Sequence, residues 1–308
     1  MAMETIFAVS TQREALTELC AGAGALASHV TAVLFGTPEE AQAAAGCGAE
    51  QVLYCPTADD VRPEDYAAAI AAEVKKVPSA LVMVNNDIRG RCLAGMIGAL
   101  LDTSVLSGIS GIEAGAEGIV CRRMVYGGTA HRRTVFVKPY GVVTVGSGLF
   151  EAPAAASAPA PVAALACTAQ PGMQRIALHE KKERVVNLVA AKRIVDVGRG
   201  LAAEADLELC RRLAAALGAE VGCSRPVAEN NKWMPKSCYM GITGVQVKPE
   251  LIVVLGVSGQ VQHIGGINKS RVIVAVNKDK AAPIFKNADF GLVGDLYKVV
   301  PALIEKLS

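Results

Sequence analysis

Hydrophobic and polar positions follow two repeating patterns along the first hundred residues. Short apolar runs of strand length are followed by segments in which apolar residues recur every three or four positions, as in amphipathic helices. The predicted strands cover residues 6–9, 29–35, 51–54 and 80–84, and the predicted helices cover 13–26, 38–45, 63–74 and 89–101. Alternation at this spacing predicts βαβ units around a largely parallel sheet.

The pattern changes between residues 119 and 145. Two or three β-rich runs are separated there by Gly127, Gly128 and Gly141. We expect these runs to be antiparallel strands added to the first sheet. No early strand is followed closely by a glycine-rich loop that could hold a phosphate, so we interpret this half as a scaffold or a partner surface.

Residues 152–171 are rich in Ala and Pro and poor in large apolar side chains. This composition predicts a linker or an extended crossing segment. We therefore expect an N-terminal α/β domain over residues 1–184, which includes that segment, and a second domain over residues 185–308.

The second half again alternates strands and helices, which predicts a doubly wound, Rossmann-like domain. The predicted strands cover residues 193–197, 251–255, 271–276 and 290–293, and the predicted helices cover 203–216 and 296–307. Gly218 follows the first helix at the position where a left-handed residue often ends a helix. Pro301 should kink the last helix or delay its start.

Polar and small residues follow these strands where each strand ends. Gly256, Ser258 and Gly259 come after the run LIVVL, Asn277 follows the next strand, and Asp295 follows the last. Ligands of doubly wound sheets bind at the carboxyl ends of the strands, and a small-residue loop before a helix start suits a phosphate. The pattern predicts a nucleotide-type cofactor.

The amino-acid composition limits which kinds of binding partner and which cellular compartment we expect. The chain of 308 residues has a net charge of only +2, which favours a protein or small-molecule partner over nucleic acid or an anionic membrane. The nine cysteines form no CxxC pair, as expected for a reducing compartment. There is no signal-peptide pattern and no apolar run of the roughly 18 residues that span a bilayer, so we expect a cytoplasmic protein without membrane insertion.

Ordered motifs in the second half resemble the alpha subunit of electron transfer flavoproteins. They are GRGL at 198–201, SRP at 224–226, GITG at 241–244, PELIVVLGVSGQVQHIGGINKS at 249–270, VAVNKD at 274–279, API at 282–284 and ADFGLVGDL at 288–296. The resemblance implies FAD in the second domain and a heterodimer with a beta subunit. It also implies an electron carrier between dehydrogenases and other redox partners, which catalyses no bond chemistry alone.

The resemblance also assigns residues to parts of FAD. Those implied near the ADP portion are Arg199, Asn277, Asp295 and Leu296. Those implied along the pyrophosphate and ribityl chain are Ser258, Gly259, Gln260, Val261 and Gln262. Those implied around the isoalloxazine are Ser224, Arg225, Gly241, Ile242, Thr243 and His263, with Met240 and Gly244 beside them.

A cation near a reduced flavin stabilises its negative charge. Arg225 is a permanent cation, His263 can donate a hydrogen bond or add charge, and Thr243 could tune protonation of the ring. Plainer roles stay open: an exposed loop arginine, a core histidine, and a capping function for Asp295. Trp233 either packs beneath the flavin loop or contacts a partner.

Two sequence features indicate which kind of electron transfer flavoprotein alpha subunit this chain resembles. Many family members carry a glutamine where this chain has Ile242, which puts the usual flavin potential in question. The segment SRPVAENNKWMP resembles members from anaerobic acyl-CoA metabolism, which implies an acyl-CoA dehydrogenase as partner. Electron bifurcation with a second FAD in the beta subunit, and with ferredoxin or flavodoxin as acceptor, is a hypothesis.

Three other functions are open to a chain of this pattern. A nicotinamide-dependent dehydrogenase needs GxGxxG and an acidic residue about 20 positions later, which GRGLAAEAD at 198–206 does not supply. A non-redox adenine-nucleotide module would bind ATP or AMP without yellow colour. A lone chain could hold FAD as a homo-oligomer.

In the family mechanism the FAD domain swivels, with residues 152–171 and 180–184 as hinge candidates.

Overall fold

The structure is a computed structural model that describes residues 3–57, 61–126, 129–153, 155–165, 176–177 and 186–307. The chain divides into two compact units, Met1–Leu178 and His179–Ser308, and each has hydrophobic clusters of its own. The predicted boundary between residues 184 and 185 lies outside the described residues, as do the hinge candidates 180–184.

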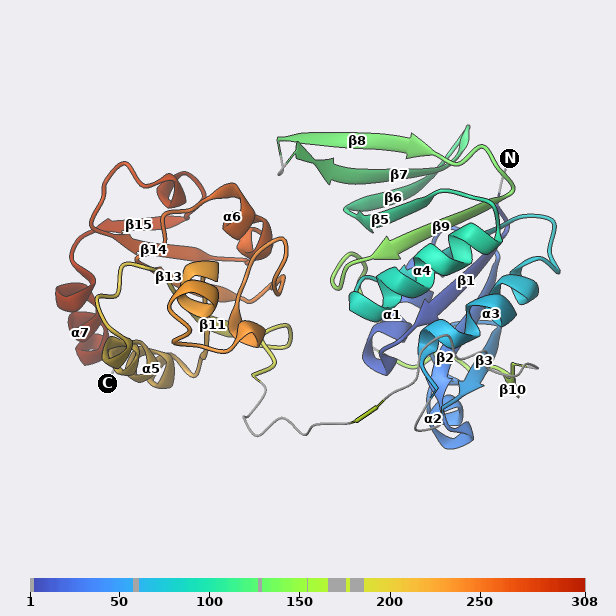
Figure 1. The fold of residues 1–308 in the computed structure, drawn as a ribbon, viewed down its shortest axis with the longest axis horizontal. Coiled ribbons are helices and arrows are strands. Elements are labelled where there is room, and N and C mark those ends of the chain that lie inside the picture. Colours follow the sequence, from blue (N-terminus) through green and yellow to red (C-terminus); the bar gives the residue numbers. More distant parts are fainter. Residues whose placement is uncertain are drawn as a thin grey trace. The chain divides into compact units, whose positions relative to one another are not determined.

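The first unit alternates strands and helices as predicted (Figure 1). Its strands are β1 (Thr5–Ser10), β2 (His29–Gly36), β3 (Gln51–Pro56), β4 (Ala80–Asn85), β5 (Val105–Ile109), β6 (Gly111–Gly115), β7 (Gly118–Val125), β8 (Ala130–Val135), β9 (Tyr140–Val145) and β10 (Val162–Ala164). Its helices are α1 (Arg13–Gly24), α2 (Pro38–Ala43), α3 (Ala67–Val74) and α4 (Ile88–Leu100), and a 3₁₀ helix, Pro63–Tyr66, precedes α3.

The main sheet of this unit has seven strands in the order β10-β3-β2-β1-β4-β9-β5, all parallel. Successive side chains of a strand point to opposite faces. Ile6 and Ala8 of β1 therefore pack in the cluster that contains α1 and α2 residues, whereas Phe7 and Val9 pack in the cluster that contains α3 and α4 residues. Both faces are covered, as parallel sheets require.

The antiparallel strands are not added to that sheet, contrary to our expectation. Strands β6, β7 and β8 form a three-stranded antiparallel sheet of their own. The run that ends at Val145 is instead β9, which pairs in parallel with β4 and β5 in the main sheet. Residues 141–145 are buried, and an apolar run buried on both faces is typical of an interior parallel strand.

Part of the Ala- and Pro-rich segment belongs to the first unit. Strand β10 pairs in parallel with β3, and Leu165 is buried against the α3 and α4 side of the sheet. The N–H groups of Ser157 and Ala160 donate to the carbonyls of Gly46 and Ala45 at 3.0 Å each. Residues 155–165 are therefore a docked edge, not a linker. Residues 166–171 lie outside the described part.

The second unit is a five-stranded parallel sheet. Its strands are β11 (Arg193–Val197), β12 (Glu220–Cys223), β13 (Leu251–Leu255), β14 (Ile273–Asn277) and β15 (Phe290–Val293), and its helices are α5 (Leu207–Leu217), α6 (Val261–Ile267) and α7 (Leu296–Leu307). The spatial order β12-β11-β13-β14-β15 is the flavodoxin-like order of doubly wound sheets. Helices α5 and α7 pack together on one face, and α6 lies on the other (Figure 1).

Two local predictions for these helices have different outcomes. Gly218 ends α5 in the left-handed conformation, with φ of 59°, as predicted. Pro301 lies inside α7, and the helix begins at Leu296, so the proline does not delay its start.

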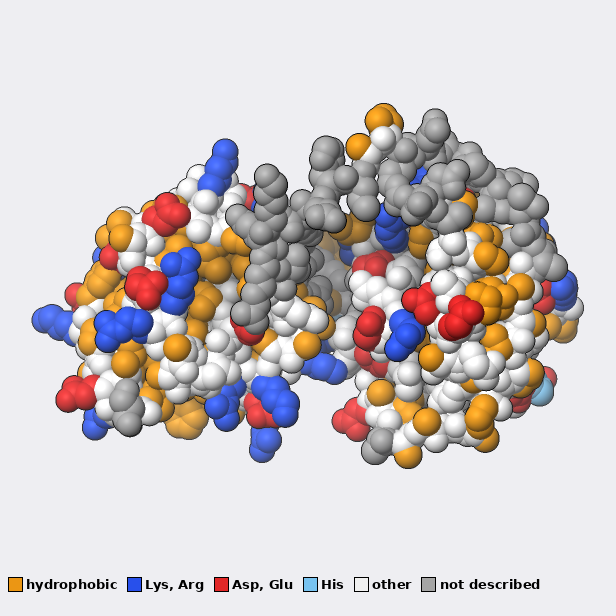
Figure 2. Space-filling model, turned by 90° about the horizontal axis from the view of Figure 1, so that it is seen from below, with side chains coloured by type: hydrophobic (Ala, Val, Ile, Leu, Met, Phe, Trp, Pro, Cys, Tyr) orange, Lys and Arg blue, Asp and Glu red, His pale blue; other side chains and the backbone are white. Residues whose placement is uncertain are grey.

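Both signs of charge are mixed on the described surface. On the face shown in Figure 2, basic and acidic side chains are interspersed over both units, consistent with the net charge of +2. Arg122 and Arg133 on the antiparallel sheet pair with Glu113 and Glu117. Within the described ranges, no helix combines the length and the apolar character needed to cross a membrane.

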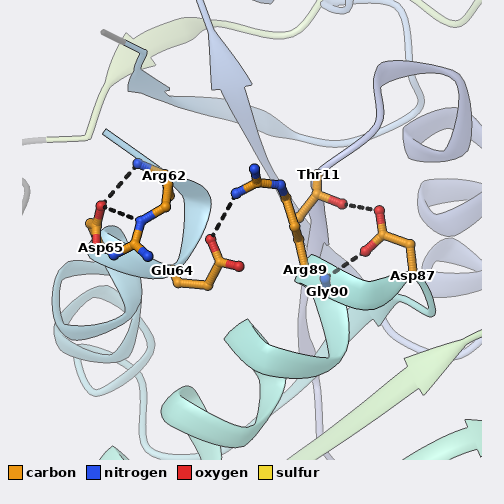
Figure 3. Close-up of polar contacts among 7 residues, drawn as sticks. All are labelled: Thr11, Arg62, Glu64, Asp65, Asp87, Arg89 and Gly90. Carbon is orange, nitrogen blue, oxygen red and sulfur yellow. Dashed lines mark hydrogen bonds and ion pairs between the residues drawn. The ribbon is translucent and has the colours of Figure 1, made fainter. Parts of the chain in front are cut away.

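A polar cluster ties the ends of β1 and β4 together (Figure 3). The Asp87 carboxylate accepts the Gly90 N–H at 2.5 Å, which caps α4, and it accepts the Thr11 hydroxyl at 2.8 Å. The Thr11 N–H donates to the Asn85 side chain at 2.8 Å. A Cβ at Gly90 would lie 1.9 Å from the Asn85 carbonyl oxygen, so this cap requires glycine.

Ion pairs next to this cluster hold the start of the 3₁₀ helix. Arg62 pairs with Asp65 at 2.7 Å, and Arg89 of α4 pairs with Glu64 at 3.4 Å. These polar groups satisfy one another, so the cluster has a structural explanation.

Replacement of Asp87 by Ala should lower the free energy of unfolding of the first unit by about 1–2 kcal/mol, because α4 loses its cap. The measurement is urea denaturation followed by circular dichroism. Glu113→Ala is the matched control, since Glu113 pairs with Arg122 on an exposed surface and should cost less than about 1 kcal/mol. Equal midpoints for the two variants would contradict the role of the cap.

Candidate functional site

The carboxyl edge of the second unit's sheet gathers the residues that the sequence singled out. Arg199 follows β11, Ser224 and Arg225 follow β12, and residues 258–263 follow β13. Asn277 ends β14, and Asp295 and Leu296 lie at the start of α7. The strand order reverses direction between β11 and β13, which is where ligands bind in sheets of this type.

At this switch point two loops touch backbone to backbone. The Gly198 N–H donates to the Leu255 carbonyl at 2.8 Å, and the Gly200 N–H donates to the Gly256 carbonyl at 3.0 Å. A Cβ at Gly256 would lie 2.7 Å from the Gly200 Cα, and Gly256 has a φ of +63°. Both space and conformation therefore require glycine at Gly256.

The loop after β13 presents unbonded backbone donors. Its carbonyls are used: that of Val257 accepts the Asn277 side chain at 2.8 Å, and that of Ser258 accepts the Ile284 N–H at 3.0 Å. The N–H groups from Val257 to Gln262 donate no hydrogen bond to the described part of the chain. Successive free N–H groups form an anion-binding concavity. The predicted helix start is present, but α6 spans only Val261–Ile267, so the loop supplies most of these donors.

A pocket of about 150 Å³ lies beside this loop at the ends of β11, β13, β14 and β15. It is lined by Gly200, Gly256, Asn277, Lys278, Gly294, Asp295, Leu296 and Tyr297. Pockets for whole ligands usually measure about 300–1,000 Å³. This one is therefore large enough for only part of a dinucleotide.

Asp295 caps α7, as the plainer interpretation predicted. Its Oδ1 accepts the Tyr297 N–H at 3.0 Å, and its carbonyl accepts the Val299 N–H at 2.9 Å. The Tyr297 hydroxyl donates to Asp206 at 2.5 Å and accepts the Ala202 N–H at 2.8 Å. That hydrogen bond from Tyr297 lowers the pKa of Asp206. The loop after β11 is thus fastened to the start of α7, across the pocket.

His263 is a buried residue with a charged partner. Its Nε2 lies 2.6 Å from a carboxylate oxygen of Asp196, which is completely buried on β11. Burial by itself lowers the pKa of His263, but the attraction to Asp196, the hydrogen bond with it and the Met240 carbonyl together raise the pKa above its ordinary value. His263 Nδ1 makes no hydrogen bond of accepted geometry among the described residues, so the plainer prediction of a satisfied core histidine is only half right.

Arg225 lies on the surface, as its plainer interpretation predicted. Its side chain is 64% exposed, and its Nε donates to Glu229 at 2.6 Å. This hydrogen bond raises the pKa of Arg225 and lowers the pKa of Glu229. The positive charge of Arg225 is thus partly neutralised by its neighbour four residues along the chain.

The segment 240–244 forms a turn against α6. The Gly244 N–H donates to the Gly241 carbonyl at 3.1 Å, and the Ile242 N–H donates to the Gln262 carbonyl at 2.8 Å. A Cβ at Gly266 would lie 2.3 Å from the Gly241 nitrogen, so this close approach requires glycine in α6.

Side chains near this turn have different environments. Thr243 shares a hydrogen bond of 2.8 Å with the Tyr239 hydroxyl. Met240 is fully buried in the core, and Ile242 is 37% exposed. Trp233 packs against the same core.

Sequence reasoning missed two residues of this edge, Asp196 and Glu229. Asp196 stands inside the apolar strand RIVDV, and a carboxylate in a buried strand is a signal in itself because burying it unpaired is costly. Glu229 lies one helical turn after Arg225, a spacing at which opposite charges pair.

Comparison with known proteins identifies the class to which this fold and edge belong. The profile of the electron transfer flavoprotein FAD-binding domain matches residues 187–268, and that of the electron transfer flavoprotein domain matches residues 9–169. The chain is 38% identical to the putative electron transfer flavoprotein subunit YdiR of Escherichia coli K12, over 99% of both chains. It is 36% identical to protein FixB of Salmonella typhimurium, over 99% of this chain and 98% of FixB.

This chain belongs to the alpha subunits of the electron transfer flavoprotein family. The resemblance seen in its motifs is thereby confirmed, as is a two-domain α/β architecture. The match of the FAD-binding domain covers the strands β11, β12 and β13 and the loops that follow them.

Replacement of Gly256 by Ala should destabilise the second unit by about 2–4 kcal/mol, because the new Cβ meets the Gly200 backbone in a left-handed conformation. Fluorescence of Trp233, the sole tryptophan, reports the unfolding of this unit. Gly95→Ala is the control: a Cβ there meets no heavy atom within 4 Å, and Gly95 belongs to the first unit. An unchanged Trp233 transition in Gly256→Ala would refute the close contact.

Proposed function

We propose that this alpha subunit binds FAD at the carboxyl edge of its second sheet. In a heterodimer with a beta subunit it passes electrons between an acyl-CoA dehydrogenase and other redox partners in the cytoplasm. The observation that carries the proposal is the run of backbone N–H groups from Val257 to Gln262, which donate to no described residue and lie beside the pocket. Neutral donors in this arrangement suit a pyrophosphate.

The residues present fit the successive parts of FAD. The pocket lined by Asn277, Asp295 and Leu296 suits the adenosine end, with Arg199 on the adjoining loop, and the loop 257–262 suits the pyrophosphate and the ribityl chain. The turn 241–244 and the residues after β12 suit the isoalloxazine. Bound FAD accepts and releases one or two electrons.

Two cationic groups have distinct tasks in this proposal. His263 offers Nδ1 as a buried hydrogen-bond donor toward the ring. Arg225 supplies positive charge from the surface, reduced by Glu229 at 2.6 Å. Both stabilise negative charge on a reduced ring, and Thr243 is held by the Tyr239 hydroxyl at 2.8 Å.

The adenine-nucleotide module is the second candidate, because the pocket alone could hold an adenosine. Two observations favour the longer ligand. Ser224 Oγ and His263 Nδ1 are buried without partners among the described residues, and neither residue lines the pocket. Buried polar atoms without a partner call for a ligand or a water, and a mononucleotide in the pocket would leave them unused.

The segment SRPVAENNKWMP supports the choice of an acyl-CoA dehydrogenase as partner, through its resemblance to members from anaerobic metabolism. Electron bifurcation is tested with the purified heterodimer, NADH and an acyl-CoA acceptor. Reduction of ferredoxin or flavodoxin only when all components are present supports bifurcation, and no reduction removes it.

Cofactor binding is tested by absorbance of the chain purified with its beta subunit, followed during stepwise dithionite reduction. The proposal predicts a yellow protein whose colour bleaches on reduction and returns in air. A colourless protein that takes up no added FAD but binds ATP or AMP would replace it by the adenine-nucleotide module. A lone chain that carries a full complement of FAD would instead argue against the heterodimer.

Replacement of Glu229 by Gln should raise the two-electron midpoint potential of the bound flavin by about 5–20 mV, because Arg225 loses its neutralising partner on an exposed surface. Glu208→Gln is the matched control, since Glu208 pairs with Arg211 on α5 at 3.6 Å. Spectroelectrochemical titration measures both. A potential that falls, or that shifts equally in the control, would contradict the placement of Arg225 near the flavin.

A further inference from the structure

Asp196 is an acid in a place where the fold should favour an apolar residue. It lies in β11 between Val195 and Val197, and all three are buried. A carboxylate removed from water loses several kcal/mol of solvation unless it is paired. Its presence requires a compensating partner.

That partner comes from a different element of the site. The Asp196 Oδ2 lies 2.6 Å from His263 Nε2, and His263 sits in α6, which follows the adjacent strand β13. The pair therefore spans the switch point of the sheet, where the ends of β11 and β13 separate. Both side chains are more than nine-tenths buried, so the interaction is shielded from solvent and salt.

The pair leaves specific atoms without partners. Asp196 Oδ1, His263 Nδ1 and Ser224 Oγ are the buried side-chain atoms that make no hydrogen bond among the described residues. Ser224 follows β12, next to β11, and its N–H donates to the Val197 carbonyl at 2.9 Å. With Nε2 committed to Asp196, Nδ1 is the ring nitrogen that remains for a ligand. The Met240 carbonyl helps to raise the pKa of His263, but Nδ1 makes no hydrogen bond of accepted geometry among the described residues.

We propose that Asp196 is a positioning residue of the cofactor site: it fixes the ring of His263 and holds it as an imidazolium that presents Nδ1–H to the flavin. The proposal rests on the proposed function and extends it to a residue outside the family motifs quoted above. It assigns Asp196 no contact with the cofactor.

Electrostatics favours this role over a purely structural one. The pair is neutral overall, but its positive end is the His263 ring, and charge-assisted hydrogen bonds are stronger than neutral ones. Without the carboxylate, only the Met240 carbonyl would still oppose burial, and burial favours the neutral ring. Other titratable groups nearby do not replace Asp196: burial keeps Cys223 protonated by raising its pKa, and Arg225 and Glu229 are paired with each other.

The first test is a histidine NMR titration of the full chain after removal of bound nucleotide. The chain has only four histidines, and His263→Gln assigns the signal of His263. In the wild type His263 should titrate above a free imidazole, and in Asp196→Asn, which keeps the shape, it should titrate below one. Equal titration in the two proteins, or a wild-type value below free imidazole, overturns the proposal.

The second test uses the FAD-loaded heterodimer. Asp196→Asn should lower the flavin midpoint potential and weaken FAD binding about five- to tenfold, the difference between a charged and a neutral donor. Asp102→Asn is the control, because it removes an exposed carboxylate from the first unit. If Asp196→Asn leaves both the potential and the affinity unchanged, the proposal fails.

A double variant separates electrostatics from misfolding. His263→Gln alone leaves Asp196 as an unpaired buried charge beside the flavin, so adding Asp196→Asn to it should strengthen FAD binding. The same substitution in the wild type should weaken it. A loss in both backgrounds would show a structural role only and would overturn the proposal.

These outcomes distinguish a failure of the proposed cofactor from a failure of the positioning role of Asp196. If His263 titrates as expected but no flavin binds, the proposed cofactor is wrong while the pairing stands. If flavin binds and Asp196→Asn changes neither the His263 titration nor the potential, the positioning role alone is wrong.

Discussion

The backbone contact between Gly200 and Gly256 is the constraint on which the candidate site depends. It joins the loops after β11 and β13 through a hydrogen bond of 3.0 Å at the point where the chain departs to opposite faces of the sheet. Beyond this contact the carbonyls of Val257 and Ser258 accept from Asn277 and Ile284, while the N–H groups of residues 257–262 donate to no described residue. Any side chain at Gly256 would separate the loops and change the direction of those donors.

The buried pair of Asp196 and His263 lies at the same switch point, and it makes the core less stable than apolar residues would. The desolvation of two ionisable groups is costly, and a core built only for stability would replace them by apolar residues. Their retention at the switch point makes sense if the ring of His263 serves a ligand. The turn 241–244 is held against α6 by the glycine at 266, so three separate segments reach the same edge through close backbone packing.

The sequence predicts where strands and helices lie better than it predicts which strands and side chains pair with one another. The run LIVVL and the residues at the strand ends could be placed because apolar runs and their small-residue loops are local signals. The sequence does not predict the pairing of β9, because a short apolar run does not reveal whether its neighbours are parallel. It does not predict β10, because three residues on an edge carry almost no pattern. The pairing of His263 with Asp196, 67 positions apart in the chain, depends on strand order, so no linear motif shows it. The pairing of Arg225 with Glu229 follows an i,i+4 spacing, but that spacing brings two side chains together only where the segment is helical.

The most direct test of the central claim is to record which backbone amides respond when FAD is added to the nucleotide-free heterodimer in which this chain is ¹⁵N-labelled. We predict that the amides of residues 257–262 shift most, with smaller shifts in the turn 241–244. ADP should shift the amides around Asn277 and Asp295 and the part of the loop that contacts its phosphates, and leave the turn unchanged. If FAD shifts other amides and leaves 257–262 unchanged, the loop is not the cofactor cradle and the account of this edge is wrong.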